Sequence, residues 1–130
     1  SHGGPQYVRP DVGLAGGFTQ TKKIAAIAES YHSAVVTHNF LGPILTAASV
    51  HLDITIPNFI TQEFTMTDET SKYDFIESSL IRKGGFIMLP DKPGLGVDIN
   101  KQMIKNTPYE PLDLNTQVPF RSDNSNAFSV

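Results

Sequence analysis

Short apolar segments alternate with helical patterns through the first half of the sequence, and this alternation limits the possible folds most. Residues 7–9, 34–37 and 59–64 are rich in β-branched and aromatic side chains, which is typical of strands. Amphipathic stretches long enough for helices separate them. A strand followed by a helix and another strand is the signature of parallel pairing with helical crossovers. The sequence therefore predicts a β-α-β-α-β arrangement, which is an α/β fold.

The two helices between these strands have recognisable starts and apolar faces. The first is predicted to begin at Thr19, whose hydroxyl can cap it, and to run to about residue 31. Its apolar residues recur at helical spacing, at Ile24, Ile27, Ala28 and Tyr31. The second helix is predicted to begin at Gly42-Pro43, because proline suits the first helical position. Its apolar face consists of Leu45, Ala48 and Leu52.

The second half of the sequence has a different character. Residues 81–89 predict a hairpin with a glycine turn, and Asn100 is placed to cap a short helix. From Pro108 onward the sequence is rich in proline, asparagine and serine, which predicts an extended tail lying on another surface. We therefore divide the chain into residues 1–67, which carry the strand and helix units, and residues 68–130, which carry the hairpin, the short helix and the tail.

Composition and charge exclude several classes of function. The formal net charge is −3 and no basic cluster is longer than Lys22 and Lys23, so nucleic acid is not expected as a partner. No apolar run reaches the roughly 18 residues of a membrane span, so no membrane is expected either. The chain has no cysteine, which removes disulfides and thiolate metal sites and suits a reducing cytoplasm, where we expect the protein.

Three polar residues follow the three predicted strands and are the main candidates for chemistry. Asp11, His38 and Glu63 are spaced about 25 residues apart, so parallel pairing brings them to one edge of the sheet, where α/β folds bind ligands. Asp11 can accept a hydrogen bond from His38 and set its tautomer, which leaves the second ring nitrogen free to move a proton. Glu63 can contact a substrate or act as a second acid. Each residue could instead serve only as a cap or a loop hydrogen-bond partner, and this alternative stays open.

Other polar features are interpreted as structural. His32 precedes a strand, and His51 lies in the second helix. The Gly16-Gly17 pair lacks a phosphate-binding pattern and fits a tight turn before a helix. The acidic residues between positions 68 and 77 have no recognisable ligand spacing, so no metal ligand is predicted within this chain.

Several motifs resemble those of the enolase superfamily, in the branch of mandelate racemase and muconate lactonizing enzyme. The matching segments are residues 9–19, 22–25, 28–31, 37–44, 57–63 and 92–97. The likeness is sharpest at residues 37–44, Thr-His-Asn-Phe-Leu-Gly-Pro-Ile, and it follows chain order over nearly the whole sequence. Within the branch, the sequence is most similar to the galactonate, gluconate and mannonate dehydratases.

The resemblance implies that the three strands are the sixth, seventh and eighth of a (β/α)₈ TIM-type barrel, so that the chain is the C-terminal part of this fold. It implies that His38 is the catalytic acid/base, that Asp11 is its dyad partner, and that Glu63 stabilises the intermediate near the substrate carboxylate. Asn39 is expected to contact the substrate. The tail would pack on the barrel and on an N-terminal capping domain that shapes the substrate pocket.

The reaction implied by the resemblance is the Mg²⁺-dependent dehydration of a sugar acid. Removal of the proton α to the carboxylate forms an enediolate, which Mg²⁺ stabilises, and loss of the β-hydroxyl yields a 2-keto-3-deoxy acid. The acidic Mg²⁺ ligands and a second acid/base of this family are expected before residue 1, and a complete barrel needs roughly 250 residues. This chain of 130 residues is therefore expected to be inactive alone. Its expected partners are a sugar acid, the remainder of the barrel and, in a homo-oligomer, further copies.

Two other functions remain open from the sequence. A racemase, epimerase or cycloisomerase of the same superfamily begins with the same enediolate, and fold analogy does not separate these reactions. A non-catalytic remnant or fragment belongs to a different class. The lack of predicted metal ligands favours this remnant, whereas the combination of Asp11, His38 and Glu63 argues against long drift away from catalysis.

Overall fold

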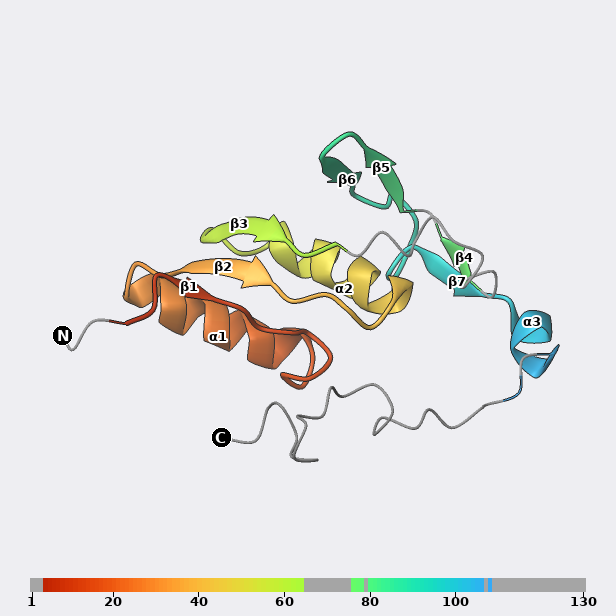
Figure 1. Ribbon diagram of the computed structural model, residues 1–130, viewed down its shortest axis with the longest axis horizontal. Helices are drawn as coiled ribbons and strands as arrows, with labels where there is room; N and C mark the ends of the chain where they lie inside the picture. Colours follow the sequence, from red (N-terminus) through yellow and green to blue (C-terminus); the bar gives the residue numbers. More distant parts are fainter. Residues whose placement is uncertain (1–3, 65–75, 79, 107, 109–130) are drawn as a thin grey trace, which may run out of the picture.

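A three-stranded parallel sheet with two helices forms the centre of the structure, a computed structural model (Figure 1). The structure describes residues 4–64, 76–78, 80–106 and 108. The strands are β1 (Tyr7–Val8), β2 (Ala34–Thr37) and β3 (Phe59–Gln62), paired in the order β1-β2-β3. The connecting helices are α1 (Phe18–Ser30) and α2 (Pro43–Asp53). The predicted β-α-β-α-β arrangement is therefore confirmed.

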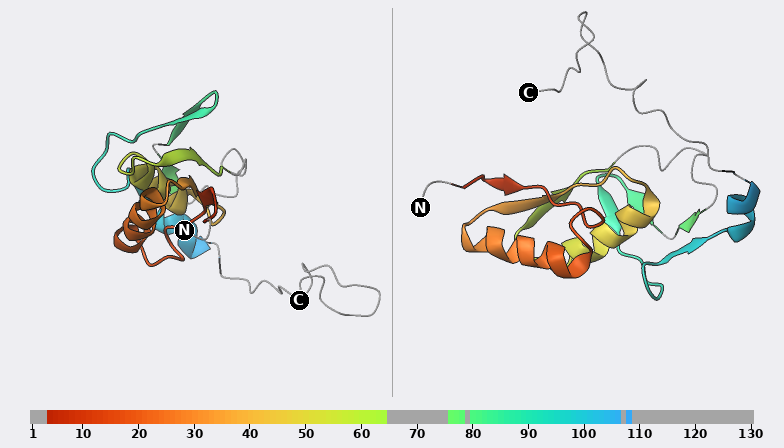
Figure 2. Two further views of the ribbon diagram at one scale, coloured as in Figure 1. Left: turned by 90° about the vertical axis from the view of Figure 1, so that its left-hand side faces the viewer. Right: turned by 90° about the horizontal axis from the view of Figure 1, so that it is seen from below.

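The hydrophobic core lies between the sheet and its two helices, which pack on the same face and against each other (Figure 2). Val35 of β2 is fully buried and belongs to one cluster with Ala25 of α1 and Leu52 of α2. Leu45 and Ala48 pack against this cluster, so the predicted apolar face of α2 is confirmed. Burial of an aliphatic side chain such as Val35 stabilises the fold by about 1.5–3 kcal/mol.

The start of α1 differs from the prediction. The helix begins at Phe18 with Gly17 as its N-cap, and no side chain makes a capping hydrogen bond, so the prediction of Thr19 as the cap was wrong. Gly17 has a φ of 89°, a left-handed conformation that glycine adopts without strain. This glycine turns the chain directly into the helix before Thr19 is reached.

The inward face of α1 also differs from the prediction. Its buried residues are Thr21, Ala25 and Ala28. The exposed fraction is 37% for Ile24, 63% for Ile27 and 68% for Tyr31. Of the predicted set, only Ala28 faces the core. Helical spacing shows which residues share a face but not which face meets the sheet, and here small side chains let α1 approach the sheet closely.

The remaining described elements are short. They are β4 (Ile76–Ser78), β5 (Ile81–Lys83), β6 (Phe86–Met88), β7 (Val97–Ile99) and α3 (Lys101–Asn106). β5 and β6 form the predicted hairpin around Gly84-Gly85, and β4 pairs antiparallel with β7. Asn100 Oδ1 accepts hydrogen bonds from the backbone N–H groups of Gln102 and Met103, so the predicted cap of α3 is confirmed.

Part of the predicted organisation lies beyond the described residues. The division at residue 67 stays a prediction, because residues 65–75 are outside the described ranges. The predicted tail from Pro108 onward is also outside them, apart from Pro108 itself. Among the residues that the structure describes, no helix is both long and apolar enough to cross a membrane.

Asp53, at the end of α2, is a buried carboxyl group that contacts the sheet. It is 5% exposed, and its Oδ1 accepts a hydrogen bond from the hydroxyl of Thr37 in β2. Its Oδ2 has no hydrogen-bond partner within the described ranges. Burial raises the pKa of Asp53 to about 7, because a single hydroxyl donor only partly offsets the lost solvation.

Replacing Asp53 by asparagine is predicted to remove a pH dependence of stability. Between about pH 4 and pH 7 the folded state keeps a proton that Asp53 loses on unfolding. The free energy of unfolding therefore falls as pH rises through this window, by at most about 1.4 kcal/mol per pH unit. Urea unfolding midpoints of the wild type and Asp53→Asn at pH 5 and pH 8 measure the effect. The matched control is Asp98→Asn at an exposed position of β7, and an equal slope in wild type and Asp53→Asn would contradict the prediction.

Candidate active site

Asp11, His38 and Glu63 lie beyond the ends of the three parallel strands, at one edge of the sheet. Asp11 and His38 form a parallel bridge that continues the pairing of β1 with β2, and the N–H of His38 donates to the carbonyl of Pro10 at 3.0 Å. On the other side, the N–H of Glu63 donates to the carbonyl of Thr37 at 3.0 Å. Backbone pairing therefore brings the three predicted residues together.

A β-bulge decides which residue of the third strand meets His38. The pairing of β2 with β3 shifts by one residue after Val35, so β3 carries one extra residue at this point. After the shift Thr37 pairs with Gln62, which places Glu63 beside His38. In an unshifted ladder, Gln62 would lie beside His38, and Glu63 would lie beside Asn39.

The predicted hydrogen bond between Asp11 and His38 is present. His38 Nδ1 lies 2.7 Å from Asp11 Oδ2, and Asp11 Oδ1 accepts the N–H of Leu14 at 2.9 Å. Asp11 is 6% exposed, and its burial alone would raise its pKa. The hydrogen bonds from Leu14, His38 and the N–H of Gly13 together outweigh burial and lower the pKa, so Asp11 is ionised at neutral pH.

The ionised Asp11 determines what His38 can do. A carboxylate only accepts hydrogen bonds, so it holds the proton of a neutral His38 ring on Nδ1. The opposite nitrogen, Nε2, is then an acceptor, and the 29% exposure of the side chain lets a bound molecule reach the ring. This arrangement is the one that a general acid/base requires.

Glu63 lies on the other side of the His38 ring. Its Oε2 is 3.7 Å from His38 Nε2 and accepts the N–H of Asn39 at 3.1 Å, while its Oε1 forms an ion pair with the guanidinium of Arg9. The Asn39 N–H lowers the pKa of Glu63 most, burial opposes it, and Arg9 and His38 lower it further. Glu63 is therefore also held as a carboxylate.

Asn39 and Arg9 both contact other residues of the site, Asn39 through its backbone and Arg9 through its side chain. The Asn39 side chain is 1% exposed, and its amide donates to Thr46 of α2 at 2.8 Å. Only the backbone N–H of Asn39 reaches Glu63, so substrate contact by Asn39 stays a prediction. The sequence prediction does not include Arg9. Its position two residues before Asp11, on the same face of an extended segment, is the signal that could have identified it.

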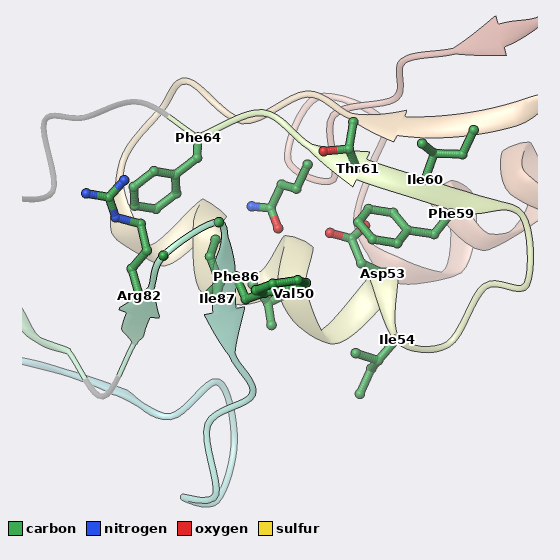
Figure 3. Close-up of a pocket in the computed structure, with 13 residues that line it drawn as sticks. Val50, Asp53, Ile54, Phe59, Ile60, Thr61, Phe64, Arg82, Phe86 and Ile87 are labelled. Atoms are coloured by element: carbon green, nitrogen blue, oxygen red, sulfur yellow. The ribbon is translucent and has the colours of Figure 1, made fainter.

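A cavity of about 590 Å³ lies apart from these residues, between β3, the end of α2 and the β5–β6 hairpin (Figure 3). Apolar side chains such as Phe59, Ile60 and Phe86 form much of its lining. None of Asp11, His38 and Glu63 lines it. The cavity is therefore separate from the candidate active site.

The described residues do not form a metal site. Within the described ranges, no group of three or more histidine, aspartate or glutamate residues could hold a metal ion. The carboxylates of Asp11 and Glu63 are engaged by hydrogen bonds and by the ion pair with Arg9. Mg²⁺ therefore does not fit this donor set.

Comparison with known proteins identifies relatives of the chain. Residues 1–103 match the family model described as enolase C-terminal domain-like. The sequence is 39% identical over 116 residues to a D-galactonate dehydratase of Pectobacterium atrosepticum, and the match covers 82% of this chain and 30% of that protein. The chain thus spans about a third of the length of this curated relative.

Solved structures give the same family. A mandelate racemase/muconate lactonizing enzyme from Jannaschia superposes with a TM-score of 0.76 at 31% identity, covering 85% of this chain and 28% of that chain. An enolase from Agrobacterium radiobacter with bound sodium and L-malate superposes with a TM-score of 0.83 at 27% identity, covering 97% of this chain and 35% of that chain. The chain therefore belongs to the enolase superfamily, in its mandelate racemase and muconate lactonizing enzyme branch.

Proposed function

We propose that this chain is the C-terminal part of a sugar-acid dehydratase and carries the proton-transfer histidine of that enzyme. The observation that carries the proposal is the hydrogen-bonded pair of Asp11 and His38, whose free Nε2 lies at the sheet edge beside Glu63. The D-galactonate dehydratase relative supports the substrate class, a sugar acid. Carbon–oxygen lyase chemistry on such an acid needs a group that moves a proton at carbon, and His38 is placed for this.

The sheet supports a larger (β/α)₈ barrel in which β1, β2 and β3 are the sixth, seventh and eighth strands. β1 and β3 form open edges in Figure 1, and the exposed fraction is 57% for both Tyr7 of β1 and Ile60 of β3. On α1, Ile27 and Tyr31 are mostly exposed as well. Open strand edges and exposed apolar side chains are usually covered by other parts of a protein. Neighbouring strands and helices of the barrel would cover them here.

Buried polar atoms near β3 support the same proposal. Gln62 Nε2 and Asp53 Oδ2 are buried without a hydrogen-bond partner among the described residues. Both residues line the cavity beside β3, and Figure 3 labels Asp53 there. The large majority of buried polar groups in native structures have a hydrogen-bond partner. A further segment of the parent protein, packed along β3, would pair them.

The family membership supports a parent protein that carries further parts of the active site. We assign the acidic Mg²⁺ ligands, a second acid/base and the capping domain to this remainder, as the resemblance to the superfamily implies. The isolated chain is then inactive, and the complete enzyme acts on a small sugar acid as a homo-oligomer.

The geometry suits His38 to transfer a proton during dehydration. Neutral His38 takes a proton on Nε2 while Asp11 holds Nδ1–H and balances the positive charge of the ring. A protonated Nε2 returns a proton to the departing β-hydroxyl, which leaves as water, and the resulting enol becomes the 2-keto-3-deoxy acid. Which of these transfers belongs to His38 depends on the stereochemistry of the substrate.

Variants of the dyad test the role of His38. In the parent enzyme, His38→Asn and Asp11→Asn are predicted to lower kcat on the order of 100- to 10,000-fold. His38→Asn removes the acid/base, and Asp11→Asn no longer holds the His38 proton on Nδ1. Steady-state kinetics with the preferred sugar acid measures this, and circular dichroism reports folding. His32→Asn is the matched control, because His32 is exposed and asparagine tolerates its φ of 57°. A kcat near that of the wild type in His38→Asn would contradict the assignment.

The product tests the reaction class. Incubation of the parent enzyme and Mg²⁺ with D-galactonate, D-gluconate, D-mannonate and galactarate is predicted to convert at least one of them to a 2-keto-3-deoxy acid. Proton nuclear magnetic resonance in D₂O would show the dehydrated product with one deuterium at carbon 3. The deuterium appears because the active-site acid that protonates the enol has exchanged with the solvent.

Other outcomes of this assay identify the alternatives. An isomer that has exchanged its α-proton without losing water would show a racemase or epimerase and contradict the dehydratase. No conversion and no exchange with any of the four acids would favour a non-catalytic protein.

A further inference from the structure

We propose that Arg9 is a positioning residue that holds Glu63 as a hydrogen-bond acceptor facing His38. We call the contact of Arg9 with Glu63 the clamp. It follows from geometry, and only its consequence for turnover rests on the proposed function. Arg9 acts through Glu63 and is not assigned any contact with the substrate. The proposal therefore adds a fourth side chain to the set of Asp11, His38 and Glu63.

The two carboxylate oxygens of Glu63 are held from two different segments. Oε1 forms the ion pair with the guanidinium of Arg9, which follows β1. Oε2 accepts the backbone N–H of Asn39, which follows β2. Two points of attachment fix both the position and the rotation of the carboxylate, whereas either contact alone would leave it free to turn.

The guanidinium of Arg9 links the two outer strands of the sheet. The strand order is β1-β2-β3, so β1 and β3 do not pair with each other. Val8 packs against the core cluster beneath the sheet, and strand alternation places the side chain of Arg9 on the opposite, open face. The Arg9 side chain is 52% exposed. It therefore reaches past β2 over the open face to meet Glu63 beyond β3.

The negative charges of Glu63 and Asp11 around His38 explain the need for a cation beside Glu63. The titratable groups that face Glu63 within the described ranges are Arg9 and His38, with the ionised Asp11 behind the His38 ring. Without Arg9, two carboxylates would flank one histidine, and an acidic substrate would bring a third negative charge. The guanidinium offsets the charge of Glu63 and so permits an anion to bind beside it.

The clamp separates the two roles that the sequence leaves open for Glu63. A second general acid must carry a proton, but the Asn39 N–H and Arg9 both favour the ionised carboxylate and lower the pKa of Glu63. An ionised Glu63 can accept a hydrogen bond from a substrate hydroxyl, and its Oε2 lies 3.7 Å from His38 Nε2, where it pairs with the charge of a protonated ring. Glu63 is thus an acceptor that orients its partners.

The first test measures the protonation of Glu63 directly in the parent enzyme. With ¹³C-labelled glutamate, the carboxyl resonance of Glu63 is assigned by its loss in Glu63→Gln and is followed against pH. In Arg9→Gln the midpoint is expected to move to higher pH, whereas Arg9→Lys keeps it close to wild type. Arg9→Met is a second neutral variant that retains the aliphatic stem. Lys23→Gln, an exposed position on α1, controls for loss of a surface charge.

The second test follows turnover. Arg9→Gln is expected to lower kcat roughly 10- to 100-fold, because a misplaced Glu63 no longer orients its partners. The acidic limb of the kcat/KM profile is expected to move to higher pH in Arg9→Gln and to return in Arg9→Lys. A purely structural Arg9 would change amounts of folded enzyme without moving this limb.

The two tests distinguish failure of the clamp from failure of the proposed function. A Glu63 midpoint that is the same in wild type, Arg9→Gln and Arg9→Met would overturn the role of Arg9, whatever the enzyme turns over. A shifted midpoint in a protein that converts no sugar acid would support the clamp and reject the dehydratase.

Discussion

The parallel pairing of β2 with β1 on one side and β3 on the other is the interaction on which the rest of the structure depends. Asp11, His38 and Glu63 follow three different strands, so only the sheet brings them together. Backbone hydrogen bonds to the carbonyls of Pro10 and Thr37 continue the pairing past the strand ends and fix where each side chain starts. The core beneath, centred on Val35, holds this register in place. The register of the sheet therefore determines where the backbone of each site residue lies.

The surroundings of each carboxyl group, rather than its residue type, set its charge. Asp11 is buried but accepts several N–H donors, which lower its pKa in spite of burial. Asp53 is buried with a single hydroxyl donor, and its pKa rises to about 7. Glu63 is more open and is held ionised by a backbone N–H and a guanidinium. Two ionised carboxylates thus face the two nitrogens of His38, and a third carboxyl group, Asp53, lies below the sheet with a raised pKa.

The sequence predicts the strands, the helices and the pairing of Asp11 with His38, because β1 and β2 keep the same register at Tyr7–Ala34 and at the Asp11–His38 bridge. It does not reveal the bulge after Val35, since an extra strand residue leaves no mark in the pattern of apolar side chains. The sequence therefore predicts that Glu63 shares a sheet edge with His38, but not the register that places it directly beside the ring. The sequence also does not predict the role of Arg9, because its partner Glu63 follows β3, two strands away from β1. The outward turn of Ile27 depends on the packing of α1, which helical spacing does not determine.

Proton transfer by His38 depends on Asp11, which holds one ring nitrogen and leaves the other free. The ¹⁵N chemical shifts of the His38 ring test this most directly, in protein labelled at histidine and observed at a pH where the ring is neutral. We expect Nδ1 to carry the proton in the wild type and this preference to be lost in Asp11→Ala. A neutral ring protonated on Nε2, or a tautomer that does not respond to Asp11→Ala, would contradict this role of Asp11.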